Sequence, residues 1–265
     1  MHPMLNIACR SARKAGNLIA KYYETSSTIT VNQKIEFDFI TNIYQKVEHL
    51  IVEIIHKSYP QHIIISEANA QLLDTDNNVQ WIVNSLDGMA NFIKRLPHFA
   101  ISVAVRTKGY TEVAVVYDPM RNELFTAVRG QGAQMNGYRL RGSIARTLDG
   151  VILATGFPVL QRQYYHNYLI LLSNLHIQQV DFRCTGSVAL DLSYVAAGRM
   201  DGFFKMGLKP WSVISGELII REAGGIVTDF SGDHNYFTSG NMIAGNPRIL
   251  KAILLTMNKK YRQNI

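Results

Sequence analysis

The chain has 265 residues, of which 47% are hydrophobic and 18% are charged, and its net charge is +7. This balance is typical of a globular protein with a sizeable core and excludes a disordered chain. No apolar run approaches the roughly 18–20 residues that a membrane-spanning helix needs, so we expect no contact with a membrane. Cys9 and Cys184 lack the spacing of metal ligands, which favours reduced thiols and a cytoplasmic location. The dispersed basic residues are consistent with a basic surface that has no special role, or with a surface that binds RNA or an acidic protein partner.

Helix and strand patterns alternate through the first half of the chain. Apolar residues recur at helical spacing over residues 5–22 and 43–58, and Asn42 is placed to cap the second helix. Strand patterns cover residues 62–66, 81–86, 99–107, 111–119 and 122–130. The last two strands are predicted to form a hairpin, and residues 130–137 are predicted to be a loop without a nucleotide-binding fingerprint.

The second half has the same alternation. Strands are predicted over 151–157, 178–183, 201–206, 225–230 and 242–245, and helices over 161–174, 186–197, 211–223 and 247–259. Gly198 follows the second of these helices and is expected to take the left-handed conformation that ends a helix. The whole pattern predicts a layered α/β fold in one domain over residues 1–265, with a first part of about 1–145 and a second of about 146–265.

Five segments carry a family likeness, and they read SEANA, NSLDGMANF, RCTGSVALDLSYVAAGRMDGFF, PWSVISGELIIREAGG and AGNP. In this order and over nearly the whole chain, the sequence resembles the inositol monophosphatase family. The resemblance implies a five-layer αβαβα sandwich that usually forms a homodimer. It also implies Mg²⁺-dependent hydrolysis of a small polyol phosphate, in which carboxylates hold metal ions that activate a water.

The resemblance places the metal site on residues that are only partly retained. The carboxylates of Glu67 and Asp87 and the backbone carbonyl of Leu86 match the family's metal ligands, whereas three further carboxylate positions are occupied by Ala68, Asn84 and Ser212. The family's water-positioning threonine and its aspartate partner are replaced by Met89 and Tyr44. No intact catalytic set remains, and we expect Mg²⁺ to bind weakly or not at all, because a hard cation binds neutral oxygens poorly.

The substrate pocket implied by the family consists of Leu86, Asp87, Gly88, Met89, Arg183, Lys205 and Ser212. Lys205 stands where the family often has a glutamate, which inverts one charge of this pocket. Each retained polar residue also has a structural interpretation. Glu67 and Asp87 suit structural hydrogen bonds at strand ends and turns, and Arg183 suits an ion pair that supports the fold.

No other catalytic constellation is visible in the sequence. His62, His98, His166 and His234 are dispersed without the spacing of zinc ligands. Ser187 and Ser212 lack the surroundings of a serine nucleophile. The chain therefore reads as a fold that is maintained while its reaction site has been lost.

Two functions remain open. Segments such as RKAGNLIAKYYE and NFIKRLPHFA resemble a bacterial branch of the family. That branch implies a Nus factor in antiterminated transcription of ribosomal RNA, which binds NusA and RNA polymerase, assists rRNA folding as a chaperone and supports ribosome biogenesis. The alternative is an inositol-1-monophosphatase with a weakened magnesium site, or a phosphate- or polyol-binding protein without turnover. Whether the chain is an enzyme stays open.

Overall fold

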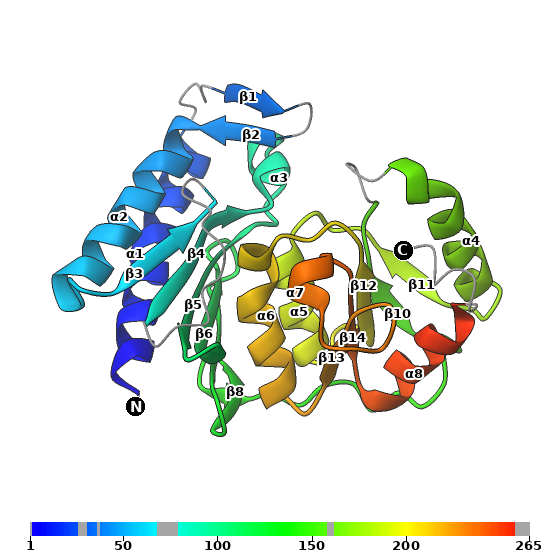
Figure 1. The fold of residues 1–265 in the computed structure, drawn as a ribbon. Helices are drawn as coiled ribbons and strands as arrows, with labels where there is room; N and C mark the ends of the chain where they lie inside the picture. Colours follow the sequence, from blue (N-terminus) through cyan, green and yellow to red (C-terminus); the bar gives the residue numbers. More distant parts are fainter. Residues whose placement is uncertain (1, 26–30, 36–37, 68–78, 158–161, 258–265) are drawn as a thin grey trace.

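The computed structural model describes residues 2–25, 31–35, 38–67, 79–157 and 162–257. Its elements stack in five layers, in which helices and sheets alternate (Figure 1). Two helices cover one face of a seven-stranded sheet, two more lie between the two sheets, and a last pair covers the outer face of the five-stranded sheet. This arrangement confirms the predicted αβαβα sandwich.

The first layer consists of α1 (Pro3–Glu24) and α2 (Asn42–Ser58), which pack on the sheet through an apolar stripe on each helix. On α1 this stripe includes Ala8, Ala12 and Ala15, all fully buried. The spacing of three and four residues puts these small side chains on one face, so the helix can lie close to the strands. Gly16 marks the closest approach, since a Cβ there would lie 2.5 Å from the Tyr117 ring on β6.

The second layer is a sheet with strand order β3-β4-β5-β6-β7-β8-β9. Only the β3–β4 pair is parallel, and the other neighbours are antiparallel. The strands are β3 (Ile63–Ser66), β4 (Gln80–Asp87), β5 (Ala100–Thr107), β6 (Tyr110–Asp118), β7 (Glu123–Val128), β8 (Gly132–Met135) and β9 (Tyr138–Arg139). All eight residues of β4 are buried, because α2 covers one face of the sheet and α6 the other.

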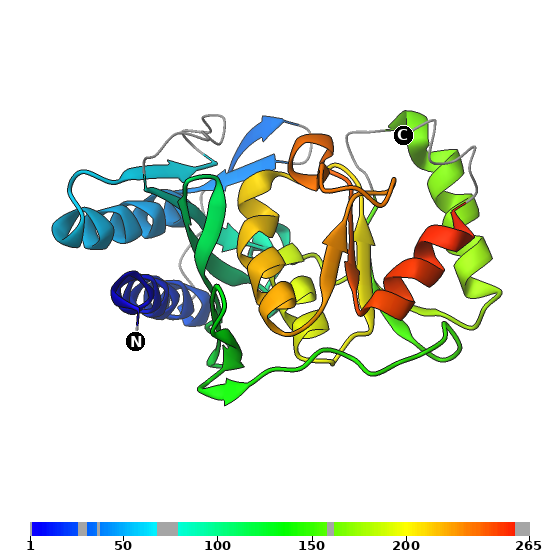
Figure 2. The same cartoon turned by 60° about the horizontal axis from the view of Figure 1, so that its bottom comes forward.

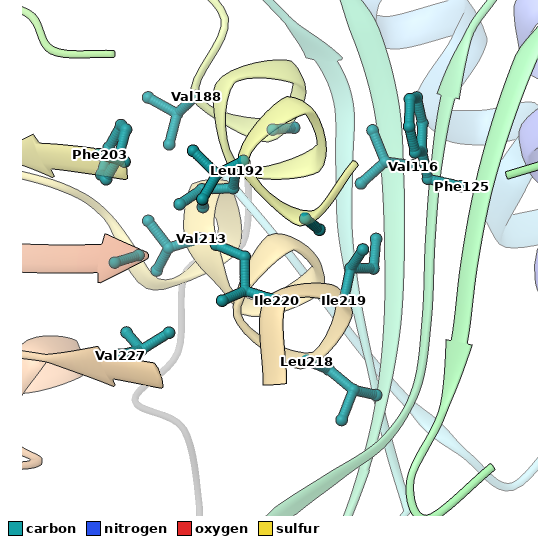
Figure 3. Packing of buried hydrophobic residues seen from close by; sticks show 14 of the residues in the cluster. Val116, Phe125, Val188, Leu192, Phe203, Val213, Leu218, Ile219, Ile220 and Val227 are labelled. Carbon is teal, nitrogen blue, oxygen red and sulfur yellow. The ribbon is translucent and has the colours of Figure 1, made fainter. Parts of the chain in front are cut away.

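The central layer holds α5 (Val188–Ala196) and α6 (Pro210–Glu222). Figure 3 shows Leu192, Ile219 and Ile220 of these helices between Val116 of one sheet and Val227 of the other. Helices covered on both sides need apolar residues around most of their circumference, and both sequences meet this need. The two helices therefore bury the inner faces of both sheets in one shared core.

The fourth and fifth layers come from the second half of the chain. The sheet has the order β11-β10-β12-β14-β13, in which β10 is parallel to both of its neighbours. Its strands are β10 (Ile152–Ala154), β11 (Asp181–Arg183), β12 (Gly202–Lys205), β13 (Ile226–Thr228) and β14 (Met242–Gly245). Helices α4 (Tyr165–His176) and α8 (Pro247–Thr256) cover its outer face, as the turned view shows (Figure 2).

Several short elements were not predicted from the sequence. They are a hairpin of β1 (Val31–Ile35) and β2 (Asp38–Thr41) and the helices α3 (Met89–Ile93) and α7 (Tyr236–Ser239). The 3₁₀ turn η1 (Arg162–Tyr164) begins the helix predicted over 161–174. The prediction of a loop over residues 130–137 was wrong, because this segment contains β8. Left-handed Gly130 and Gly137 form the turns on either side of β8, and its Ala133 is buried.

Asn42 lies inside α2 as its first residue rather than before it. The end of the predicted last helix, residues 258–259, lies outside the described residues.

The predicted helix end at Gly198 is confirmed, since this glycine has φ +70° after the last turn of α5. No helix in the described part of the chain combines the length and apolar character required to cross a membrane.

Candidate functional site

The carboxylate of Asp87 joins the two halves of the molecule. Asp87 ends β4, and its Oδ2 accepts hydrogen bonds from the Ser187 hydroxyl at 2.6 Å and the Ala189 backbone N–H at 2.9 Å. Ser187 is the N-cap residue of α5, whose first backbone N–H groups have no partner within the helix. Asp87 therefore stabilises the start of α5, and its negative charge is favoured by the positive end of the helix dipole.

Asn84 completes the set of donors around this carboxylate. Its side-chain Nδ2 donates to Asp87 Oδ1 at 3.2 Å, and both residues are buried. Two carboxylates at these positions would repel each other unless a cation lay between them. With asparagine at position 84, an N–H group takes the place of the cation, and both oxygens of Asp87 have donors from protein groups.

A second buried carboxylate lies near this point. Asp191 of α5 is 2% exposed and accepts a hydrogen bond from the Thr185 hydroxyl at 2.6 Å. Burial raises the pKa of Asp191 to about 7, while Thr185 and the positive charge of Lys205 act in the opposite direction. Burial also raises the pKa of Asp87, whereas the hydrogen bonds that this carboxylate accepts and the charge of Lys205 act to lower its pKa.

Lys205 thus faces two carboxylates from the end of β12. Its side chain lies against Gly156, where a Cβ would come within 3.1 Å of Nζ. The ammonium group supplies one positive charge to a region with two buried carboxyl groups. A lysine at position 205 is therefore consistent with the local balance of charge.

The second retained carboxylate, Glu67, follows β3 and is half-buried. The charges of Glu67 and Glu48 both act on the hydroxyl of Tyr44, which is 4% exposed. Burial, and then these two charges, raise the pKa of Tyr44 far above its usual value, so the phenol remains protonated. Ser66 donates to Glu48 Oε1 at 2.5 Å and holds this carboxylate beside β3. Tyr44 therefore fills with a neutral ring the place where the family has an aspartate.

The turn after β4 is shaped by Gly88, which has φ +89°. A Cβ at this position would lie 2.9 Å from the His98 carbonyl oxygen, so only glycine fits. Met89, the first residue of α3, and Leu86 both pack into the apolar cluster under α1 and α2. The Met89 side chain offers a thioether to this cluster, which cannot position a water as a hydroxyl does.

The remaining predicted positions have local contacts of their own or fall outside the described residues. Ser212 is half-buried in the first turn of α6, where its N–H donates to the Lys209 carbonyl at 3.0 Å. Arg183 is exposed and pairs with Asp181 at 2.8 Å. Ala68 is not among the residues that the structure describes.

Three residues of this site were missed by sequence reasoning. Ser187 precedes an apolar helix and could have been found as an N-cap, and Asp191 stands alone as a charge within that helix. Thr185, whose hydroxyl binds Asp191, gives no such signal. Asn91 supports the region by donating from its side-chain amide to the carbonyls of His98 and Thr185, both at 2.8 Å.

The donor set can be compared with the needs of a magnesium centre. Across the described ranges, no three His, Cys, Asp or Glu side chains form a group that could hold a metal ion. Magnesium requires several oxygen ligands at short distance, and the Asp87 oxygens accept hydrogen bonds from three protein donors. The residues that the structure describes here do not fit a two-metal centre.

Comparison with known proteins gives a consistent result. The family model described as "Inositol monophosphatase family" matches residues 1–263. The Nus factor SuhB of Escherichia coli K12 is 63% identical over 97% of this chain and 96% of its own. Among solved structures, the extragenic suppressor protein SuhB of Bartonella henselae is 36% identical with a TM-score of 0.92, and the match covers 97% of this chain and 99% of that one. An inositol monophosphatase of Thermotoga maritima is 30% identical with a TM-score of 0.87 over 99% of both chains.

The family match spans nearly the whole chain, and the five-layer architecture is shared with solved members. The chain belongs to the inositol monophosphatase family.

Proposed function

We propose that this protein is a Nus factor that works without catalysis. In this role it binds NusA and RNA polymerase, together with other Nus factors, and supports processive antiterminated transcription of ribosomal RNA. It thereby assists rRNA folding and ribosome biogenesis in the cytoplasm. The observation that carries the proposal is the 63% identity, over almost the full length, to a protein named Nus factor SuhB. A net charge of +7 also suits work beside RNA, whose phosphates attract basic surfaces.

The site supports the non-catalytic part of the proposal. Members of the inositol monophosphatase family generally use Mg²⁺. Here Asn84 donates to Asp87, the helix α5 uses the same carboxylate as a cap, and Lys205 adds a positive charge. Mg²⁺ is therefore expected to bind weakly or not at all, and the family reaction to be impaired or inactive.

The direct test is binding of the purified protein to NusA and RNA polymerase from its own organism, by calorimetry and gel filtration. The Glu67→Gln variant keeps the size of the side chain and removes a retained metal-ligand carboxylate. We expect this variant to bind NusA within about twofold of the natural protein and to support antitermination in a reporter strain. If the folded natural protein binds neither NusA nor RNA polymerase, the Nus assignment is contradicted. Loss of antitermination in Glu67→Gln contradicts the proposal that the protein works without catalysis.

A second candidate function is an inositol-1-monophosphatase with a weakened metal site, which the retention of Glu67 and Asp87 favours. It is tested by hydrolysis of inositol-1-phosphate over a wide range of Mg²⁺ concentrations. The proposal expects turnover at least a thousandfold below that of an intact family enzyme, a difference of about 4 kcal/mol in the barrier. Turnover within tenfold of such an enzyme would establish the phosphatase instead.

A further inference from the structure

A hollow of about 530 Å³ lies on another part of the molecule, and its lining includes none of the residues of the Asp87 site described above. The turn between β5 and β6, the end of β7, one side of α6 and the residues that begin α7 surround it. The side chains that matter here are Arg106, Tyr110, Arg129, Glu217, Arg221 and Phe237. Ligand sites commonly have a volume of this size and combine aromatic surface with a few polar groups.

The side chain of Arg106 is the feature of this hollow that indicates a ligand-binding site. The residue is 9% exposed, and it sits at an irregularity in the β5–β6 register, where a bulge redirects a side chain. Its Nη2 donates to the Gly109 carbonyl at 2.6 Å, and its guanidinium lies 5.9 Å from the centre of the Phe237 ring. Its buried Nε makes no hydrogen bond with any residue that the structure describes. A buried donor without a partner costs about 1–3 kcal/mol, so the protein alone satisfies this guanidinium incompletely.

Among the described residues, Arg106 forms no ion pair with a carboxylate. Glu217 is 6% exposed and accepts hydrogen bonds from the side chains of Arg221 and Tyr236. Glu222 is used by the backbone N–H groups of Gly130 and Gly132, at 2.8 and 2.7 Å. Glu217 thus bonds Arg221 and Tyr236 directly and acts on Arg106 only through its charge, so the guanidinium of Arg106 lines the hollow without a carboxylate hydrogen bond from any described residue. An anion is the complement of such a charge.

The rim of the hollow is aromatic. Tyr110 is 58% exposed, and the guanidinium of Arg129 lies 4.2 Å from the centre of its ring. Arg129 is also near Glu112, at 3.7 Å, which fixes its position over the tyrosine. An exposed tyrosine stacked with an arginine is a surface on which flat rings stack.

The geometry points to a site for a small ligand that joins a phosphate group to a flat ring, as nucleoside monophosphates do. The phosphate oxygens bind Arg106 at the bottom of the hollow, and the ring stacks at Tyr110 and Arg129 on the rim. A double helix cannot reach an arginine that is nine-tenths buried. The ligand is therefore a free mononucleotide or the terminal nucleotide of a single RNA strand.

Calorimetry with the full-length protein tests this site. The probes are GMP and AMP, with inorganic phosphate and guanosine as the separate parts of the ligand. We expect both mononucleotides to bind, and each part alone to bind at least tenfold more weakly. Arg106→Gln and Tyr110→Ala should each weaken the binding of GMP at least tenfold, and Arg106→Lys should retain part of it. Tyr138→Ala and Arg248→Gln, which change exposed residues elsewhere, should stay within twofold of the natural protein.

Further measurements distinguish a free nucleotide from the end of an RNA strand, and binding in this hollow from binding at the Asp87 site. Binding should persist in Lys205→Met, because Lys205 belongs to the Asp87 site. A 5′-phosphorylated RNA decamer that binds at least tenfold better than its 5′-hydroxyl form identifies a strand end as the source, whereas binding of mononucleotides alone identifies a free ligand. If Arg106→Gln does not fold, the binding of GMP to Tyr110→Ala is the deciding measurement. Absence of mononucleotide binding at millimolar concentration, together with equal binding of the two RNA decamers, overturns the proposal, as does binding that Tyr110→Ala leaves unchanged.

Discussion

At the scale of single residues, the oxygen atoms of Asp87 show how a family position can change its use. Oδ2 accepts from Ser187 and Ala189, and Oδ1 accepts from Asn84. These bonds connect the end of β4 to the start of α5, so they act on folding whether or not a reaction takes place. Removing the acceptor leaves three buried donors without a partner, and the cost of that loss can be measured.

We expect Asp87→Ala to lower the free energy of unfolding by about 2–4 kcal/mol, because the donors stay buried and the Ala189 N–H at the start of α5 loses its acceptor. Urea denaturation followed by circular dichroism measures this change. Asp181→Ala is the control, since it removes an exposed ion pair with Arg183 and should cost less than about 1 kcal/mol. Equal effects of the two changes would mean that Asp87 has no structural role.

Asp191 gives the molecule a predicted dependence on pH. Its pKa is raised by burial from 3.8 to about 7, so the folded protein holds a proton that the unfolded chain releases between about pH 4 and pH 7. The free energy of unfolding should therefore fall as the pH rises through this window. In Asp191→Asn this contribution disappears, while the side-chain oxygen can still accept from Thr185. Urea denaturation at several pH values should show a steeper fall in the natural protein than in Asp191→Asn, and parallel curves would contradict the prediction.

The missing carboxylates can also be restored. The triple change Ala68→Glu, Asn84→Asp and Ser212→Asp adds three negative charges at the family's metal positions, and we expect it to raise the affinity for Mg²⁺ at least tenfold. Phosphatase activity should not return, because Met89 and Tyr44 still replace the residues that position water. Titration calorimetry measures the first outcome and hydrolysis of inositol-1-phosphate the second. An unchanged Mg²⁺ affinity would show that charge is not what the site lacks.

At the scale of elements, the central layer depends on a close contact between α5 and α6. A Cβ on Gly216 would lie 2.5 Å from the Leu192 Cβ, and both residues belong to the buried centre of their helices. The contact is between a helix backbone and the root of a side chain, so neither partner can move away by a change of rotamer alone. The glycine sets the distance between the helices.

Gly216→Ala should therefore lower the free energy of unfolding by about 1–3 kcal/mol, as overpacking of a core commonly does. The helix preference of alanine offsets part of this cost, because alanine favours a helix interior by about 1 kcal/mol over glycine. Gly142→Ala serves as the control, since its Cβ would meet only the Val195 carbonyl oxygen, at 3.7 Å. If Gly216→Ala is as stable as the control, the helices have room to separate.

The elements also show what a sequence pattern can predict. Long periodic segments such as α1 and β5 were predicted because their apolar spacing reflects burial directly. The four-residue strand β8 was missed because Gly130, Gly132 and Gly137 read as a loop, although Gly130 and Gly137 form the turns on either side of a strand that Gly132 begins. In the site, the replacement of carboxylates that the family resemblance implies is a prediction from residue types. The bond from Asn84 to Asp87 was not predicted, because the orientation of an amide depends on the tertiary structure.

At the scale of the whole molecule, the proposed role as a Nus factor requires a folded surface that binds partners and no reaction at the Asp87 site. Family resemblance implies a homodimer, and the described surface has a candidate contact beside α4. Phe157 is 53% exposed, Leu169 54% and Ile170 40%, and Phe157 lies 6.2 Å from the Tyr168 ring of that helix. Exposed apolar side chains on and next to one helix are candidates for a surface that binds another protein.

We expect Phe157→Asp to convert a dimer into a monomer at micromolar concentration, because a charge placed in an apolar interface loses its hydration without gaining a partner. Light scattering coupled to gel filtration measures the mass, for which one chain contributes 29.9 kDa. Ile144→Asp is the matched control, since Ile144 is 94% exposed and lies outside this patch, and it should remain a dimer. A Phe157→Asp protein that stays dimeric places the interface on another surface. A monomer that still binds NusA would separate assembly of the dimer from assembly of the transcription complex.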